Sequence, residues 1–306
     1  MRILNFGSLN IDYVYRVDTF VQPGETKSSK GFMINSGGKG LNQSIAAAKA
    51  GNEVFHAGLM SCDGGFLVEK LRQAGVDTSL MQPSNEVSGH AIIQVADSGQ
   101  NCILLYGGTN QMLTEAYVDQ TLDAFGREGL VLLQNETNLV GEIILKAAQR
   151  GLKVALNAAP YSAAVNSYPI NCLDWLIVNE VEGAGIAGSD TDEHLLERLA
   201  EKFPAAGILL TLGSTGAHCY QDGRFASINS CKVQSVDTTA AGDTFSGYFL
   251  YGVLNGLSLT ETLRLATVAS ALCVQRAGAA DSIPNKAEVD QALQEGALGK
   301  LEVKTW

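Results

Sequence analysis

The chain has 306 residues, enough to bury a large core, and its content of 46% hydrophobic and 17% charged residues is typical of a globular protein. A net charge of −11 at pH 7 argues against a nucleic acid or an anionic membrane surface as partner, so an anionic ligand needs a local site. No apolar run approaches about 18 residues, and the first strand-like run stops at Gly7 without the apolar core of a signal peptide.

Short apolar runs alternate with helical patterns along the chain. The runs carry little polar alternation, which suits strands buried on both faces of a parallel sheet. The predicted strands are 3–6, 54–57, 130–133, 154–157, 175–178 and 208–211, and helical patterns include 42–50, 66–74 and 193–203. This alternation predicts an α/β fold with a doubly wound, mostly parallel central sheet.

Two segments break this rhythm. Residues 13–32 and 90–106 have the pattern of alternating strands around the turn signals at 22–24 and 97–99. We expect them to pair into a small sheet that projects from the core and covers a site. The predicted division is a core of 1–11, 33–88 and 108–306 and a β lid of 12–32 and 89–107.

The cysteines and histidines give no sign of a metal centre. The six cysteines are scattered without a C-x-x-C pair, which suits buried thiols in a reducing compartment. We therefore expect a cytoplasmic protein without disulfides or zinc. The four histidines are dispersed without an H-E-x-x-H motif, and we interpret them as structural.

The most informative motif runs from Asp237 to Asp243 and contains Ala240, Ala241 and Gly242 directly before an apolar, helical run at 245–254. A helix that begins there presents free N–H donors and the positive end of its dipole, which together form an anion site. An acid at the mouth of such a site repels a resting anion, but it can serve as a general base beside a phosphoryl group. The spacing alone equally allows an ordinary helix start capped by Asp or Thr.

Further polar motifs lie where predicted strands end. Asn10 and Asp12 follow the first strand, and an amide beside a carboxylate can hold neighbouring sugar hydroxyls, although both residues also favour plain turns. The loop 37–42, Gly-Gly-Lys-Gly-Leu-Asn, lets the backbone approach a small polar ligand, or is simply flexible; its spacing is not that of a P-loop. Glu136, Asn157, Asn179 and the run 213–216 occupy the same position after later strands.

The run Gly183-Ala184-Gly185-Ile186-Ala187-Gly188 matches the dinucleotide-binding fingerprint, with Glu201 at a plausible offset for a ribose-binding acid. The fingerprint should open a helix directly after a strand. Here 179–182 intervene after the strand, and we expect the next helix only beyond 189–191, which resemble caps. An NAD-dependent oxidoreductase is therefore an alternative rather than the leading hypothesis.

Taken in order, the motifs resemble those of the ribokinase-like (PfkB-type) carbohydrate kinase family, and its ribokinase branch most closely. The motifs that carry the resemblance are 7–12, 37–42, 154–160, 179–182, 211–216 and 237–243. They span nearly the whole chain. The resemblance implies a doubly wound, mostly parallel sheet flanked by helices with a small β lid, and a homodimer formed through that lid.

The resemblance also implies a reaction: transfer of the γ-phosphoryl group of ATP to a primary sugar hydroxyl, the 5-hydroxyl of D-ribose in that branch. Asp243 would be the general base, beside an anion hole formed by Ala240, Ala241 and Gly242. The implied sugar ligands are Asn10, Asp12, Gly38, Lys39, Asn42, Glu136 and Asp243. The implied nucleotide site consists of Asn179, Thr211, Gly213, Ser214, Gly216, Gly242 and Thr267.

Two cations are implied as cofactors. Mg²⁺ would accompany ATP with Glu182 near the metal and phosphate, and K⁺ would activate from a loop that maps to Asp237, Thr239, Cys273, Arg276, Gly278 and Ser282. The wider family often has Gly at position 240; if that position needs a positive φ, Ala240 is strained by about 1–2 kcal/mol. Two further hypotheses stand beside the oxidoreductase: a kinase of another acceptor, such as deoxyribose, fructose or a nucleoside, and a non-catalytic sugar sensor.

Overall fold

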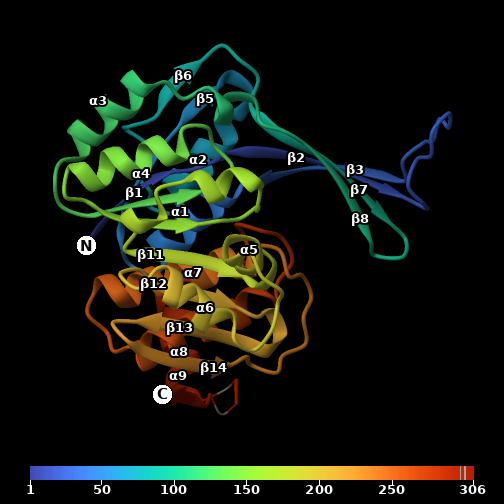
Figure 1. The fold of residues 1–306 in the computed structure, drawn as a ribbon. Coiled ribbons are helices and arrows are strands. Elements are labelled where there is room, and N and C mark those ends of the chain that lie inside the picture. The colour runs from blue at the N-terminus through green and yellow to red at the C-terminus, as the bar shows by residue number, and fades with distance from the viewer. Residues whose placement is uncertain (297, 300) are drawn as a thin grey trace.

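Within residues 1–296, 298, 299 and 301–306, which a computed structural model describes, the centre of the molecule is a nine-stranded sheet with helices on both faces (Figure 1). Across the sheet the strands follow the order β15 (Val303–Thr305), β14 (Arg224–Asn229), β13 (Gly216–Gln221), β12 (Gly207–Thr211), β11 (Trp175–Asn179), β10 (Lys153–Asn157), β9 (Leu130–Gln134), β1 (Arg2–Phe6) and β4 (Glu53–Ala57). Neighbouring strands from β12 to β4 are parallel, and β13, β14 and β15 pair antiparallel. The predicted doubly wound sheet is confirmed.

The central strands are apolar on both faces because each face is covered by helices. In β9, Leu130 and Leu132 belong to one buried cluster, whereas Val131 and Leu133 belong to the other. All four side chains are fully buried. Successive residues of a strand point to opposite faces, so a strand between two helix layers shows no polar alternation in its sequence.

The helices divide between these two clusters. One cluster receives α1 (Lys39–Lys49), α2 (Gly65–Gln73), α7 (Ala241–Leu254), α8 (Leu259–Cys273) and α9 (Lys286–Glu295), and the other receives α3 (Glu115–Phe125), α4 (Val140–Gln149), α5 (Glu180–Ala187) and α6 (Leu195–Lys202). A central sheet between two helix layers is the expected α/β arrangement. Within the described part of the chain, no helix combines the length and apolarity needed to cross a bilayer.

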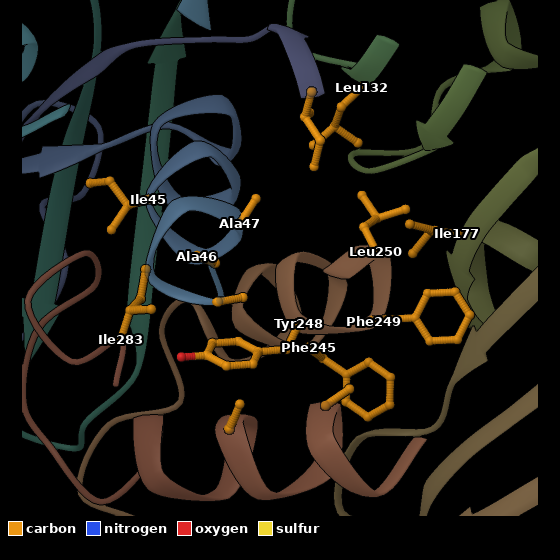
Figure 2. Close-up of a cluster of buried hydrophobic side chains, with 14 of the residues drawn as sticks. Ile45, Ala46, Ala47, Leu132, Ile177, Phe245, Tyr248, Phe249, Leu250 and Ile283 are labelled. Carbon is orange, nitrogen blue, oxygen red and sulfur yellow. The ribbon is translucent and has the colours of Figure 1, made fainter. Parts of the chain in front are cut away.

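Helix α7 is held rigidly in the core. It packs against α1 on one side and α8 on another, and its Phe245, Tyr248 and Phe249 lie in the buried cluster of Figure 2. Phe249 meets the ring of Trp175 edge to face at a centroid distance of 4.9 Å. A Cβ atom on Gly247 would come within 2.5 Å of Ala46, so α1 and α7 touch at their backbones. The N-terminus of α7 is therefore fixed in space.

A second sheet projects from the core (Figure 1). Its strands follow the order β3 (Gly31–Gly37), β2 (Asn10–Val17), β7 (Gly89–Ala96) and β8 (Asn101–Tyr106), so the two segments that broke the α/β rhythm do pair. A separate short pair consists of β5 (Leu59–Ser61) and β6 (Gln82–Ser84). Strand β8 is exposed along its whole length, and Leu104 is 68% exposed.

One helix prediction was wrong. Helix α5 begins directly after β11, at Glu180, instead of beyond 191. Asn179 and Glu182 form a capping box, which starts the helix at that point. Gly183 and Gly185 of the fingerprint-like run therefore lie inside the helix, and Gly188 is its C-cap. A Cβ atom on Gly185 would come within 2.4 Å of the Tyr161 ring. These glycines permit close packing and form no phosphate-binding turn.

Candidate active site

The carboxyl ends of the parallel strands meet at one edge of the sheet, and the chain order reverses beside β1, which lies between β4 and β9. A crevice at such a reversal is the usual ligand site of an open α/β sheet. Ser8 follows β1 and Glu136 follows β9, and the Ser8 hydroxyl donates a hydrogen bond to Glu136. The backbone N–H of Lys39 donates to the same carboxylate at 2.9 Å.

The glycine-rich loop brings α1 against the end of β1. Gly38 has φ +98°, and a Cβ atom there would lie 2.7 Å from the Ser8 carbonyl oxygen. A Cβ atom on Gly40 would come within 2.2 Å of the Ser8 backbone nitrogen, so only glycine fits. The Gly40 N–H donates to the Ser8 hydroxyl at 3.1 Å. This close approach places the start of α1 in the crevice.

The predicted sugar ligands gather around this loop. Asp12 and Asn42 each carry oxygen atoms without a hydrogen-bond donor among the described residues: both carboxylate oxygens of Asp12 and the buried Oδ1 of Asn42. Such atoms are suited to accept bonds from ligand hydroxyls. Asn10 is oriented differently, because its Oδ1 accepts from Asn110 at 2.8 Å. Sequence reasoning missed Asn110, which also bonds the backbone of Leu9.

Three acids act through their charge on the Lys39 ammonium. Burial opposes its charge, but Asp243, Glu136 and Glu182 together raise the pKa of Lys39. Burial, and then the charge of Glu136, raise the pKa of Asp12 to about 6. Burial also raises the pKa of Glu136 and of Glu182. The site therefore holds more negative charge than its one lysine balances, which favours an added cation.

Asp243 lies in the first turn of α7, buried, with both carboxylate oxygens engaged. Oδ2 accepts from Asn42 Nδ2 at 3.0 Å and Oδ1 from Gln43 Nε2 at 2.8 Å. Gln43 was not predicted, and its only signal was its place beside Asn42 at the start of a helix.

The turn before Asp243 is strained and rich in donors. Ala240 has φ +62°, so the condition for strain at this position is met. The N–H groups of Gly242 and Asp243 have no acceptor among the described residues, while that of Ala241 makes a long 3.3 Å bond to Thr238. These donors face a cavity of about 210 Å³, which Lys39, Glu182 and Asp243 also line.

A larger cavity of about 780 Å³ adjoins the other side of this turn. It brings together most of the predicted nucleotide residues: Thr211, Gly213, Ser214, Gly216, Gly242 and Thr267. Asn179 lies instead in the smaller cavity, and Thr211 and Gly242 line both. The buried Thr267 hydroxyl has no partner among the described residues and can bond a ligand. The start of α7 thus lines both cavities, and of the predicted sugar ligands only Lys39 and Asp243 line the smaller one.

The predicted monovalent-cation residues form a cluster behind this turn. Asp237 accepts bonds from the Thr239 N–H and hydroxyl at 2.9 and 2.6 Å and from the Gly278 N–H at 3.0 Å. Burial opposes its charge, but these hydrogen bonds lower the pKa of Asp237. The Cys273 thiol lies 3.0 Å from the Ser282 hydroxyl. The Arg276 side chain turns away to pair with Glu288, so only its backbone is available to an ion.

The residues around Glu182 suit a metal ion that arrives with the nucleotide. Both oxygens of Glu182 accept bonds from Asn179 at 2.9 Å. Among the described residues no group of three or more His, Cys, Asp or Glu side chains could hold a metal ion. Mg²⁺ commonly binds through one or two carboxylates, water and substrate phosphates, and this donor set fits that mode.

Known proteins with the same arrangement settle the family. A model described as the pfkB family of carbohydrate kinases matches residues 2–286. The chain belongs to this family. As a member of this family, the chain is an ATP-dependent carbohydrate kinase. The two adjoining cavities agree with an enzyme that binds two substrates.

Individual relatives are similar over nearly their whole length. The ribokinase of Haemophilus influenzae is 36% identical, over 94% of this chain and 97% of its own. The ribokinase of Schizosaccharomyces pombe is 35% identical, over 95% and 97%. The structure of Arabidopsis thaliana ribokinase complexed with ribose and ATP matches with a TM-score of 0.83 at 28% identity, over 95% of this pfkB chain and 98% of that one.

Proposed function

We propose that the chain is a ribokinase, which transfers the γ-phosphoryl group of ATP to the 5-hydroxyl of D-ribose. The observation that carries this proposal is the position of Asp243 in the first turn of α7, where it accepts a hydrogen bond from the predicted sugar ligand Asn42 and follows Gly242, which lines both cavities. The relatives named as ribokinases, one of them complexed with ribose and ATP, support ribose as the acceptor.

In the proposed reaction, Asp243 removes the proton from the acceptor hydroxyl as that oxygen attacks the γ-phosphorus, and ADP leaves. The N–H groups of Gly242 and Asp243, with the dipole of α7, stabilise the charge on the transferred group. Lys39 lines the same cavity as Asp243 and would neutralise negative charge on the transferred phosphoryl group. Mg²⁺, when bound with ATP near Glu182, would neutralise the phosphates.

The cluster around Asp237 is proposed to bind K⁺. Thr239 of this cluster directly precedes Ala240, the first residue of the anion hole, so the geometry of the cluster fixes the turn that presents the donors. A bound monovalent cation would balance the Asp237 charge and the carbonyl dipoles of this loop. The Asp237 carboxylate already binds Thr239 and Gly278, and these hydrogen bonds hold the segment at 237–239 against the segment around Gly278.

We propose that the projecting sheet is a lid, which consists of the predicted segments 12–32 and 89–107 together with the rest of β2 and of β3 up to Gly37, and that a second copy of the chain covers it. Asp12 stands on this sheet above the loop 37–42, so the sheet is placed to close on a sugar. Its apolar residues are unusually exposed, with Phe32 at 50%, Ile103 at 55% and Leu104 at 68%. Several large apolar side chains exposed on one small sheet favour an interaction surface. Six free cysteines agree with a cytoplasmic location.

The test is ADP release with ribose, deoxyribose, fructose and nucleosides as acceptors, with and without K⁺. Asp243→Asn should lower kcat by roughly 10³-fold or more while ATP and ribose still bind, because the variant keeps the size of the side chain but cannot take up the proton. Asp222→Asn, in an exposed turn between β13 and β14, is the matched control. Residual activity of Asp243→Asn within tenfold of the parent contradicts the proposed base.

The same assay decides which molecule accepts the phosphoryl group and whether the chain is a kinase or a sensor. Faster turnover of another sugar or a nucleoside would replace ribose, and no sugar-dependent ADP release would favour a sensor. Equal rates in K⁺ and Na⁺ would remove the cation proposal. The oxidoreductase has lost its basis, because Gly183 and Gly185 lie within α5.

A further inference from the structure

A chain of buried amide side chains leads from Asp243 into the sheet. Gln43 on α1 donates to Asp243, and Gln134 at the end of β9 donates from Nε2 to Gln43 Oε1 at 2.8 Å. The same nitrogen donates to Oδ1 of Asn5 on β1 at 3.1 Å. All three amides are 0% exposed. The chain of hydrogen bonds thus crosses three elements before it reaches the carboxylate.

Backbone carbonyl groups fix the far end of this chain. Asn5 Nδ2 donates to the Gly40 carbonyl at 2.9 Å and to the Ser44 hydroxyl at 2.8 Å. Ser44 lies 2.8 Å from Nδ1 of His56, whose Nε2 lies 3.1 Å from the Gly7 carbonyl. Burial lowers the pKa of His56 to about 4, so the ring is neutral near pH 7. The histidine is structural, as the sequence indicated.

These contacts determine the direction of every hydrogen bond. A carbonyl only accepts, so Nε2 of the neutral His56 carries the proton toward Gly7 and Nδ1 accepts from Ser44. Asn5 must then point its amide nitrogen at Ser44 and Gly40, and its oxygen at Gln134.

The same logic continues to the carboxylate. Gln134 turns its nitrogen to both Asn5 and Gln43, which leaves the Gln43 oxygen as acceptor and its N–H directed at Asp243. A reversed Gln43 would instead point its oxygen at the carboxylate, which is repulsive.

This network costs stability in the folded chain. The Gln134 Oε1 atom is buried without a partner among the described residues, and an unsatisfied buried acceptor costs about 1–3 kcal/mol. Apolar side chains of similar size would avoid that penalty. Stability alone therefore does not explain three buried amides in series at the base of the site.

We propose that Gln43 is a positioning residue that fixes the Asp243 carboxylate for proton abstraction, and that Gln134 and Asn5 hold its amide in the donating direction. Gln43 binds one carboxylate oxygen and Asn42 the other, so the carboxylate cannot rotate away from the acceptor hydroxyl. This inference rests on the proposed role of Asp243. It adds a requirement outside the sugar and nucleotide contacts.

The test compares Gln43→Met with Asn52→Leu. Both changes replace a buried amide with an apolar side chain of similar size. Among the described residues, the Asn52 side chain, which follows α1, donates only to Ala47, and its Oδ1 has no partner. Gln43→Met should lower kcat by roughly 10- to 100-fold with KM for ribose and ATP within about threefold, whereas Asn52→Leu should keep kcat within about twofold. Thermal unfolding shows whether both variants lose similar stability.

Gln134→Met supplies a second variant if Gln43→Met does not fold, because it releases the Gln43 amide without touching Asp243. It should lower kcat in the same sense, and the double variant should lose no more than Gln43→Met alone, since both act through one contact.

The outcomes separate this inference from the proposed function. Two results overturn the positioning role while Asp243→Asn stays inactive. One is an unchanged kcat in Gln43→Met and Gln134→Met. The other is a kcat and a KM that change in parallel with the loss of stability. Activity retained by Asp243→Asn refutes the base itself, and with it the role of Gln43.

Discussion

Asp12, whose carboxylate accepts no hydrogen bond from the described residues, should lower the free energy of unfolding of the chain at neutral pH relative to pH 4. Burial, and then the charge of Glu136, raise its pKa from 3.8 to about 6. A carboxyl group with a higher pKa when folded binds more protons in the folded state. Stability therefore falls as pH rises from about 4 to 6 and stays lower above that range. About two pH units correspond to about 3 kcal/mol.

Asp12→Asn removes this ionisation and breaks no side-chain hydrogen bond among the described residues. We expect the variant to match the parent near pH 4, where Asp12 is mostly protonated in the folded state, and to exceed it by about 2–3 kcal/mol at pH 8. Urea unfolding at a series of pH values measures this difference. Asp18→Asn, one residue beyond the end of β2, is the control: its Lys27 contact lowers the pKa of Asp18, so this change should not stabilise the chain.

A stability gain of equal size at pH 4 and pH 8, or no gain at pH 8, refutes this reasoning. Ribose supplies an independent readout. It should raise the unfolding midpoint of the parent in proportion to RT ln(1 + [L]/Kd) and have little effect on Asp12→Asn. The same carboxylate would then lower stability and provide sugar affinity.

Two further substitutions test the glycine-rich loop and the lid. Gly40→Ala should raise the KM for ribose more than tenfold, or unfold the chain at lower temperature, because its Cβ would lie 2.2 Å from the Ser8 nitrogen; Gly65→Ala, which meets nothing within 4 Å, should leave both unchanged. Leu104→Asp should shift a dimer toward monomer in sedimentation, because a charge on an apolar interface is costly to bury. Asp97→Asn, at the exposed turn of the lid, should leave the dimer unchanged. A normal ribose KM together with an unchanged unfolding temperature in Gly40→Ala contradicts the first prediction, and a monomeric parent contradicts the second.

The strands and the layers were predictable because burial on both faces leaves a direct mark on the sequence. Runs such as 130–133 are apolar at every position, and only a strand between two helix layers requires that. The helix start at Ala241 was also predictable, since capping and small residues directly precede an apolar, helical run. Local patterns therefore sufficed where the physical cause is local.

Residues whose role depends on distant partners were not predictable. Gln43 contacts Asp243 from 200 positions away, and Asn110 reaches Leu9 and Asn10 from about 100 positions away. An isolated Gln or Asn in a sequence has no periodicity to reveal such a contact. The helix at 180–187 was missed for a different reason: its glycines disfavour a helix locally, but tertiary packing on Tyr161 requires them.

A single residue connects the proposed lid to the helix whose amides bind the proposed base, Asp243. Strand β3 ends at Gly37 and helix α1 begins at Lys39, so only Gly38 lies between the sheet over the crevice and the helix that carries Asn42 and Gln43. A rotation of the sheet is therefore transmitted to the two amides that bind Asp243 unless Gly38 absorbs it. For this reason a lid substitution can alter the maximal rate without contacting either substrate, and kinetic data on lid variants measure alignment as well as affinity.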